Sequence, residues 1–386
     1  MSKIDELIKK LCPNGVRFEE LKNKKLFKFY YGKGNRIPED IGGIYDVYGA
    51  NGIVSHINEY NCEDVTIIGH IGAVGMVNRC KKKCFVTYNG TIAEVVDKTM
   101  VNSQYLYYVL TTLNLPSYKK GSQPFLSVSD FDKIRIPVPP LEVQCEIVHI
   151  LDDFTLFSAE LSAELKARKN QYNYYLEKLL CNDKNAKIYK LKELCVFFNG
   201  DRGKNYPKVS EMVNKGVPFV NAGDVNRVID YKNCNKITLE KYNSMNGAKL
   251  RKNDILYCLR GSTGKNGIYE LDEGTVASSL VAIRVNSIIN YKYLYYLLNS
   301  SLERRQRYKS DTGAAQPNLS VQSISNYEFP VPNMEEQNKI VNILDKFEKL
   351  CNDISEGLPA EIEARQKQYE YYRDKLLTFK ELKVNE

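Results

Sequence analysis

The chain has few of the residues that usually carry catalysis or metal binding. Its 386 residues include three histidines, and its ten cysteines are scattered without a Cys-x-x-Cys pair. A zinc site from Cys62, Cys80, Cys84 and His70 would need a spacing that standard zinc sites do not use, so we expect no metal. No run of about 18 apolar residues occurs, and the N-terminal segment is too charged for a signal peptide. We therefore expect a cytoplasmic protein with reduced cysteines and no membrane partner.

The common enzyme motifs are also missing. The only Pro-Pro pair lies in Val138–Leu141, which is not the Asn/Asp-Pro-Pro-aromatic loop of a DNA amino-methyltransferase. No Gly-x-Gly-x-x-Gly follows a predicted strand, and the run Arg260–Lys265 (RGSTGK) lacks the first glycine and the final Ser/Thr of a phosphate-binding loop. A polar loop position explains His70 better than general-base catalysis does. We expect the chain alone to catalyse nothing and to hold no cofactor.

What the chain does contain is an internal repeat. Gln123–Phe154 and Gln316–Phe347 share 16 of 32 residues at an offset of 193, which is far above chance. A second block, Leu161–Leu180, matches Leu358–Leu377 at an offset of 197. A chain of two such modules presents two similar faces, which is the geometry needed to read two half-sites.

Each repeat contains a long stretch with apolar residues at heptad spacing, which is typical of a helix in a coiled coil. The first stretch, Leu141–Leu180, would form a helix about 60 Å long. In the second, four extra residues near Gly357 and Pro359 predict a kink or a restart, with the proline in the first turn of the resumed helix. We expect the two helices to pack on each other, since a small domain could not cover about 60 Å of apolar stripe. The expected contact residues are Ile147, Leu151, Phe154, Leu161, Leu165, Tyr172 and Leu179 in the first helix, and Ile340, Leu344, Phe347, Leu358, Ile362, Tyr369 and Leu376 in the second.

A globular module of mixed α/β character precedes each helix. Short β-branched or aromatic runs, Asp64–Ile68 and Asp254–Cys258, predict strands of a mixed sheet, and Tyr105–Leu110 and Tyr293–Leu298 predict matching short helices. The offset falls from 190 at Asp64/Asp254 to 184 where Gly90-Thr91 is matched with Gly274-Thr275, so the modules diverge more than the helices. Two divergent modules on a common frame would recognise two different things. The predicted domains are 1–140, the helix 141–185, 186–333, and the helix 334–386.

Glycine-flanked loops in both modules carry side chains suited to base edges or phosphates, since Arg fits guanine and Asn fits adenine. The net charge of +8 permits a polyanionic partner. The alternative for each loop is an ordinary turn, in which Gly and Asn occur because they tolerate positive φ. Gln123 and Gln316 are shared by both modules, which favours a structural turn or a phosphate contact over base reading. The candidate DNA contacts are Lys33, Asn35, Arg36, Asn51, His70, Arg79 and Gln123 in the first module, and Arg202, Lys204, Asn226, Arg227, Arg260, Ser262, Thr263, Lys265 and Gln316 in the second.

These features together resemble the specificity subunit of type I restriction-modification systems over almost the whole chain. The resemblance is carried by two modules each followed by a long helix, by Gln-Pro-x-Leu-Ser and Pro-x-Pro-Pro-x-x-x-Gln, and by Lys249–Leu256 and Arg260–Lys265. The first module departs from the second, because Gly72–Gly75 follows His70 without an Arg-Gly-Ser-Thr-Gly run. Contacts are therefore not carried across residue by residue there.

The resemblance implies two target recognition domains of α/β fold, held apart by an antiparallel coiled coil of the two helices. It implies that the domains read a bipartite sequence in double-stranded DNA. The implied partners are two modification (methyltransferase) subunits, which would bind S-adenosylmethionine, and restriction subunits. The helix stripe that is not used for mutual packing would dock the modification subunits.

Two other interpretations stay open. An orphan specificity protein would serve a methyltransferase alone, and a neighbouring partner gene would distinguish it. A coiled-coil adaptor would make no DNA contact, and its affinity for a partner would not fall steeply with salt as phosphate contacts do.

Overall fold

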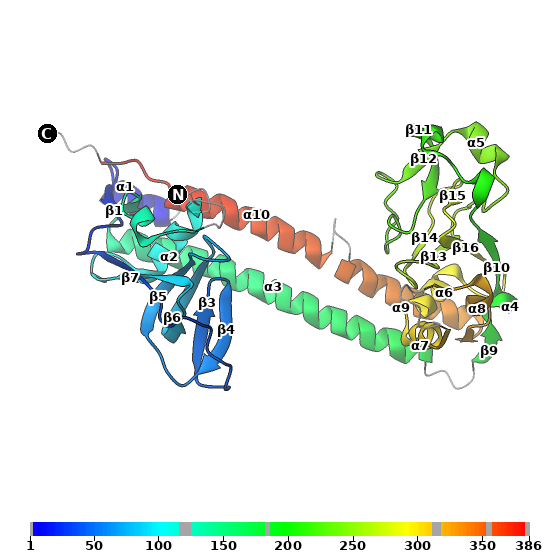
Figure 1. Ribbon diagram of the computed structural model, residues 1–386, viewed down its shortest axis with the longest axis horizontal. Coiled ribbons are helices and arrows are strands. Elements are labelled where there is room, and N and C mark those ends of the chain that lie inside the picture. The colour runs from blue at the N-terminus through cyan, green and yellow to red at the C-terminus, as the bar shows by residue number, and fades with distance from the viewer. Residues whose placement is uncertain (1–2, 116–124, 182–185, 311–317, 353–356, 383–386) are drawn as a thin grey trace. The chain divides into compact units, whose positions relative to one another are not determined.

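The computed structural model describes residues 3–115, 125–181, 186–310, 318–352 and 357–382 (Figure 1). The chain forms two compact units of mixed α/β structure. The first unit combines Met1–Ser162 with Glu361–Glu386, and the second is Ala163–Ala360. Gln123 and Gln316 lie outside the described residues. Of the helices that the structure describes, none is long and apolar enough to cross a lipid bilayer.

The first unit is built on a six-stranded sheet with the order β2-β7-β5-β6-β3-β4, in which only β3 and β6 run parallel. Its central strand β5 is buried along Val65–Ile68, which explains the nearly continuous apolar run there. The predicted short helix is α2, whose N-cap Asn102 accepts hydrogen bonds from two backbone amides. The elements are α1 (Lys3–Leu11), β1 (Arg17–Glu20), β2 (Phe27–Tyr31), β3 (Tyr45–Gly49), β4 (Gly52–Ile57), β5 (Cys62–Gly69), β6 (Val77–Val86), β7 (Gly90–Val95), α2 (Ser103–Thr112), the 3₁₀ helix η2 (Val128–Phe131) and β8 (Arg135–Val138).

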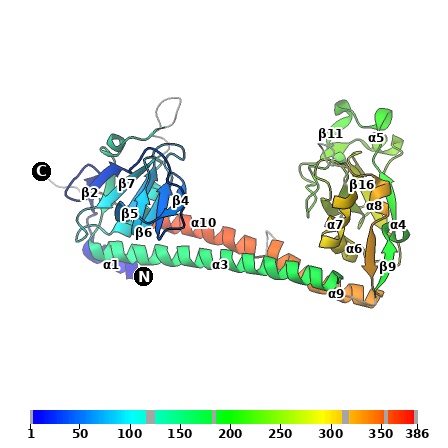
Figure 2. The same ribbon diagram turned by 60° about the horizontal axis from the view of Figure 1, so that its bottom comes forward.

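Both ends of the described sequence meet in this unit. Val16 donates its N–H to the carbonyl of Lys380 and accepts the N–H of Leu382, at 2.9 and 2.8 Å, and it forms a parallel bridge with Glu381. Strand β1 pairs with β8, and Arg135 on β8 bonds the carboxylate of Glu381 at 2.5 Å. The core joins α1, the sheet, α2 and the first turns of helix α3 (Leu141–Cys181). In Figure 2 the strands of this unit lie beside the start of that helix.

The second unit repeats these parts with one long sheet divided in two. The order β10-β16-β13-β14 corresponds to β2-β7-β5-β6, and β12-β11-β15 corresponds to β4-β3-β6, with its parallel pair kept between β11 and β15. Strands β9 and β17 pair as β1 and β8 do. The elements are β9 (Lys187–Lys190), α4 (Leu191–Leu194), β10 (Cys195–Asn199), η3 (Gly203–Asn205), η4 (Val209–Glu211), β11 (Met212–Val220), β12 (Asn235–Ile237), α5 (Leu239–Ser244), β13 (Ile255–Cys258), β14 (Asn266–Ile268), β15 (Thr275–Val276), β16 (Leu280–Val285), α6 (Tyr291–Leu298), α7 (Ser301–Ser310), α8 (Val321–Ser325) and β17 (Glu328–Val331).

This shared topology corrects two of the sequence matches. Among the described residues, Asp64 and Asn253 are the two non-glycine residues with positive φ, at 53° and 72°, and each stands two residues before the first residue of the central strand that pairs with β7 or β16, Thr66 and Ile255. The offset there is therefore 189, not the 190 that matching Asp64 with Asp254 gave. Gly90 is paired with the end of β5 as Leu280 is with the end of β13, so β7 corresponds to β16 and the match of Gly90 with Gly274 was wrong. The two modules are closer in architecture than the sequence indicated.

The long helices are α3 (Leu141–Cys181), α9 (Met334–Asn352) and α10 (Leu358–Leu377). Helix α3 begins in the first unit and ends in the second. Helix α10 begins at Leu358, so Pro359 stands in its first turn and the predicted restart is confirmed. Ile147, Leu151 and Leu376 share the core of the first unit, whereas Tyr172, Ile340 and Leu344 share that of the second.

The helices run antiparallel inside each unit. In the first unit Phe154 stacks on Tyr372 with ring centroids 5.6 Å apart, and Phe157 further along α3 meets the earlier residue Arg365 of α10. In the second unit Tyr175 stacks on Phe347 at 5.4 Å. Phe154 and Phe347 occupy equivalent positions of the repeat, and so do Tyr175 and Tyr372. Both units therefore use the same Phe–Tyr stack, with the Phe from α3 in the first unit and from α9 in the second. Each helix end also packs on its own module. Packing of helix on helix and packing of helix on module therefore occur together in each unit.

Candidate nucleic-acid interface

The run Arg260–Lys265 is a tight loop between β13 and β14. Two backbone bonds close it, from Cys258 N–H to the Lys265 carbonyl at 2.8 Å and from Gly264 N–H to the Cys258 carbonyl at 3.1 Å. Gly261 and Gly264 have φ of 74° and 85°, which glycine adopts without the strain that a Cβ would add. The loop therefore has a defined shape without any nucleotide.

A second segment crosses the base of this loop and orients its arginine. Asn318 forms an antiparallel bridge with Arg260, and the next residue, Leu319, donates its N–H to the Leu259 carbonyl at 2.9 Å. The Nε of Arg260 donates to the side-chain oxygen of Asn318 at 3.3 Å, and both residues are exposed. With Nε engaged, the two terminal nitrogens of Arg260 are left to make a planar, two-pronged contact.

A buried charge network supports the loop from α7. Arg307 lies directly against Gly264, where an added Cβ would come within 2.8 Å of its Cζ. Its Nε donates to Glu303 at 2.9 Å, and Glu303, which is 1% exposed, also accepts the hydroxyl of Tyr257. Burial raises the pKa of Glu303 and the two donors oppose that rise. Arg307 is thus held by a buried carboxylate, because breaking this ion pair would leave the charge of Glu303 buried without a partner.

The first unit presents the same loop after β5. Gly75 N–H donates to the Gly69 carbonyl at 2.8 Å, Leu126 N–H donates to the His70 carbonyl at 3.1 Å, and Gly72 and Gly75 have φ of 83° and 84°. An antiparallel bridge joins Ile71 to Phe125, as one joins Arg260 to Asn318. The structure therefore places Ile71 at the position of Arg260.

His70 lies beneath this loop and not on its surface. It is 4% exposed, its ring lies 4.7 Å from that of Tyr31 and 5.8 Å from that of Phe125, and its Nδ1 is 3.4 Å from the hydroxyl of Thr91. Burial lowers the pKa of His70, which favours the neutral ring. As a DNA contact this residue was poorly chosen, because its ring is enclosed by its neighbours.

Arg79 is also turned inward. Its guanidinium pairs with Asp64 and donates to the Val65 carbonyl at 3.0 Å and to Gln104 at 3.2 Å, and its side chain is 9% exposed. Burial would raise the pKa of Asp64, but hydrogen bonds from Arg79, Lys98 and Ser103 outweigh it and lower that pKa. Arg79 thus joins the sheet to α2, and we withdraw it, with His70, from the candidate contacts.

The other candidate residues lie at the surface. Lys33, Asn35, Arg36 and Asn51 are exposed in the first unit, and Arg202, Lys204, Asn226, Arg227, Ser262 and Lys265 are exposed in the second, with Thr263 partly buried. Lys265 donates to the side-chain oxygen of Asn226 at 3.1 Å, which brings two of the predicted loops together.

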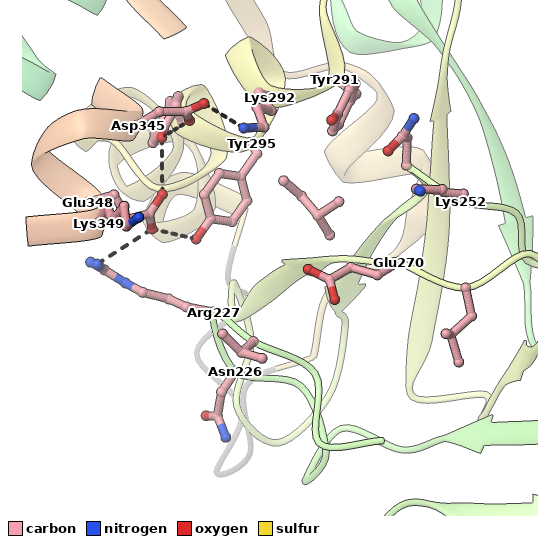
Figure 3. Close-up of a pocket in the computed structure, with 15 residues that line it drawn as sticks. Asn226, Arg227, Lys252, Glu270, Tyr291, Lys292, Tyr295, Asp345, Glu348 and Lys349 are labelled. Atoms are coloured by element: carbon pink, nitrogen blue, oxygen red, sulfur yellow. Dashed lines mark hydrogen bonds and ion pairs between the residues drawn. The ribbon is translucent and has the colours of Figure 1, made fainter. Parts of the chain in front are cut away.

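An open pocket of about 1290 Å³, lined by several charged side chains, lies within the second unit between its module and α9 (Figure 3). Lys292 bonds Asp345 at 2.5 Å, and Glu348 accepts the hydroxyl of Tyr295 at 3.1 Å and pairs with Arg227 at 3.7 Å. Arg227 therefore links a candidate reading loop to helix α9.

Cys62, Cys80 and Cys84 lie together in one core cluster that does not include His70. In the described ranges, no three His, Cys, Asp or Glu side chains gather as metal ligands would. A hydrogen bond with Cys62, together with burial, raises the pKa of Cys84 to about 12, and the two Sγ atoms lie 3.6 Å apart, so these thiols fill the core.

Comparison with known proteins agrees with this geometry. The family model for the type I restriction modification DNA specificity domain matches the chain twice, over residues 3–168 and 183–364. The chain belongs to this family. It is a specificity subunit with two recognition domains, and the internal repeat of the sequence corresponds to the pair of family matches.

Among its relatives is the specificity subunit of the Escherichia coli type I restriction enzymes EcoR124I and EcoR124II, which is 35% identical over 297 residues, covering 73% of this chain and 72% of that one. The fold is that of the type I system S subunit from M. genitalium, with a TM-score of 0.61 at 18% identity, covering 94% of this chain and 96% of that one. A chain from work on complex assembly and conformational transition of the type I R-M system has a TM-score of 0.58 at 15% identity, with 91% and 97% covered.

Sequence reasoning missed Ile71, Phe125 and Asn318. A signal for two of them was present in the repeat. The segments Gln123–Val128 (QPFLSV) and Gln316–Val321 (QPNLSV) differ only at the third residue, and that residue is Phe125 in one module and Asn318 in the other.

Proposed function

We propose that this specificity subunit reads a bipartite sequence in double-stranded DNA, with residues 1–140 and 186–333 as the two target recognition domains. Residues 141–185 and 334–386 would set the spacing between the half-sites. The observation that carries the proposal is the loop that follows the central strand of each module, which has one backbone geometry and two different sets of side chains. Two domains that recognise different sequences can share one backbone geometry but need different side chains at the contact positions.

The second module carries the clearest reading group. Arg260 is exposed, held through its Nε by Asn318, and backed by a loop that Arg307 supports. A planar arginine presented in this way matches O6 and N7 of guanine in the major groove, and such a pair contributes about 1–3 kcal/mol of discrimination. Other exposed lysines and arginines of the second module, Arg202, Lys204, Arg227 and Lys265, would position the phosphates.

Partners would supply the chemistry. We propose that two modification subunits, holding S-adenosylmethionine, dock on the outward faces of the helices and that restriction subunits join them. The chain itself would contribute recognition and no catalytic step. Its place would be the cytoplasm, where the DNA substrate lies.

Methylome sequencing tests the proposal. The chain is expressed with its modification subunit in a host without DNA methylation, and methylated adenines are mapped by single-molecule reads. We expect a split motif of two short halves around a fixed gap. No new methylation despite a stable complex, together with no salt-dependent binding of that complex to DNA, would favour an adaptor without DNA contact.

The variant Arg260→Ala then identifies the guanine reader. We expect it to relax one half-site and to leave the other unchanged. Arg251→Ala is the matched control, because Arg251 is equally exposed but precedes strand β13, whereas Arg260 follows it. Equal loss at both half-sites would contradict the assignment.

A further inference from the structure

The equivalent tips of the two modules differ in chemistry. Where the second module has the polar pair Arg260 and Asn318, the first has Ile71 and Phe125. Residues that face each other across an antiparallel bridge point to the same side, so Ile71 and Phe125 form one apolar surface. Ile71 is 44% and Phe125 38% exposed, although a folded protein gains free energy by burying such side chains.

This apolar pair is held in place by the structure beneath it. Tyr31 packs on the buried ring of His70, and its hydroxyl accepts the N–H of Val128 at 3.1 Å. His70 in turn lies edge-on to Phe125. Phe125 of the pair therefore packs on an aromatic layer formed by His70 and Tyr31.

The surroundings indicate that the occupant is DNA. Lys33, Asn35 and Arg36 are exposed and follow closely after Tyr31, whose ring packs on His70, so this part of the module carries cationic and polar groups. Lys33 also forms a bridge with Thr87, which ties it to the loop before β7. Cationic side chains in the same module as an exposed apolar pair suit the major groove of DNA, whose edges carry phosphates.

We infer that Ile71 and Phe125 are specificity-determining residues that read thymine through its 5-methyl group in the major groove. This inference rests on the proposed function, and it names the chemistry of the first half-site. In the major groove the methyl group is the apolar feature that distinguishes thymine, and side chains without hydrogen-bonding groups can recognise it. The first module thus selects by apolar contact at the position where the second selects by hydrogen bonding.

Replacing thymine by deoxyuridine tests the inference with the unaltered protein. This change removes only the methyl group. Once the split motif is known, each thymine in both halves is replaced singly, and binding of the complete complex to each duplex is measured by competition. At one or more positions we expect a loss of about fourfold, the effect of withdrawing one methyl group from an apolar contact.

A double-mutant cycle links that position to the protein. In Ile71→Ser the same deoxyuridine substitution should have no further effect, whereas in Ile53→Ser it should keep its full effect. Ile53 is a matched control because it is exposed to 52% on β4 of the same unit. If no thymine in either half is sensitive, or if Ile71→Ser leaves the sensitivity intact, the inference is wrong while the split motif still supports the proposed function. Absence of a split motif would instead overturn the proposed function itself.

Discussion

Replacing Gln337 by alanine should uncouple the second module from its helix. Gln337 is fully buried at the start of α9. Its side-chain oxygen accepts the N–H of Asn290 at 2.8 Å, and its amide donates to the carbonyls of Pro332 and Ile288 at 2.8 and 3.0 Å. Asn290 is the N-cap of α6, so one side chain joins the module, the strand before the helix and the helix itself.

The magnitude follows from these three bonds. Alanine would leave one amide and two carbonyls without their partner in a closed site, and each lost hydrogen bond contributes about 1 kcal/mol. We expect the second unit to lose about 3 kcal/mol of its free energy of unfolding, with faster amide exchange over residues 288–298. Glutamate has the same shape but puts oxygen against two carbonyls, so Gln337→Glu should cost at least as much at neutral pH and recover partly in acid.

The repeat supplies a matched test. Gln144 makes the same contacts in the first unit, with Asn102 N–H at 2.8 Å and the carbonyls of Pro139 and Met100 at 2.7 and 2.8 Å. Gln144→Ala should therefore cost about as much, seen in the exchange of residues 100–112. Gln366→Ala removes an exposed glutamine from α10 and should stay within about 0.5 kcal/mol. A loss below about 1 kcal/mol for Gln337→Ala would refute the view that this glutamine is a clamp.

Three further outcomes are expected. Gly264→Ala and Gly261→Ala should each lower the free energy of unfolding by about 1–2 kcal/mol, because both glycines have positive φ. Gly264→Ala should cost at least about 1 kcal/mol more in denaturant titrations, because its Cβ would displace Arg307 whereas Gly261 faces open space. Asp64→Asn should destabilise the first unit by about 1–3 kcal/mol at neutral pH. The folded pKa of Asp64 lies below its ordinary 3.8, so this difference should shrink as the pH falls below that value, and a difference that persisted in acid would contradict the assigned ion pairs. Shortening both long helices by one heptad, about 10 Å, should shorten the spacer by about three base pairs in the methylome and leave both half-sites unchanged.

The long helices were predictable because the heptad spacing of their apolar residues indicates helices that pack on each other. Leu141 follows a proline pair, and the heptad pattern then runs to the end of α3 with Ser158 and Arg168 as its polar interruptions. The Gln-containing motif before each helix was found as a repeat, but its role could not be derived, because it depends on backbone groups of Asn102 and Asn290, more than 40 residues away in sequence.

The modules were harder, because a match in sequence does not reveal strand register. Asp64 resembles Asp254 by residue type, yet its backbone matches Asn253. Charge drew attention to Arg79, and a strand position beside Asp64 buried it. Ile71 escaped notice for the opposite reason, because an isoleucine in an apolar run is more often part of a core.

The first unit combines early and late segments of the chain, and this affects the order in which the two units can fold during synthesis. The second unit is continuous over Ala163–Ala360, so it can complete its fold while later residues are still being made. The first unit lacks α10 and the strand-like contact of Val16 with Glu381 until the last described residues have emerged. Vectorial synthesis usually lets the N-terminal domain finish first. Here Phe154 of the first unit cannot stack on Tyr372 until α10 has been made, so we expect the N-terminal module to be the later of the two folding events.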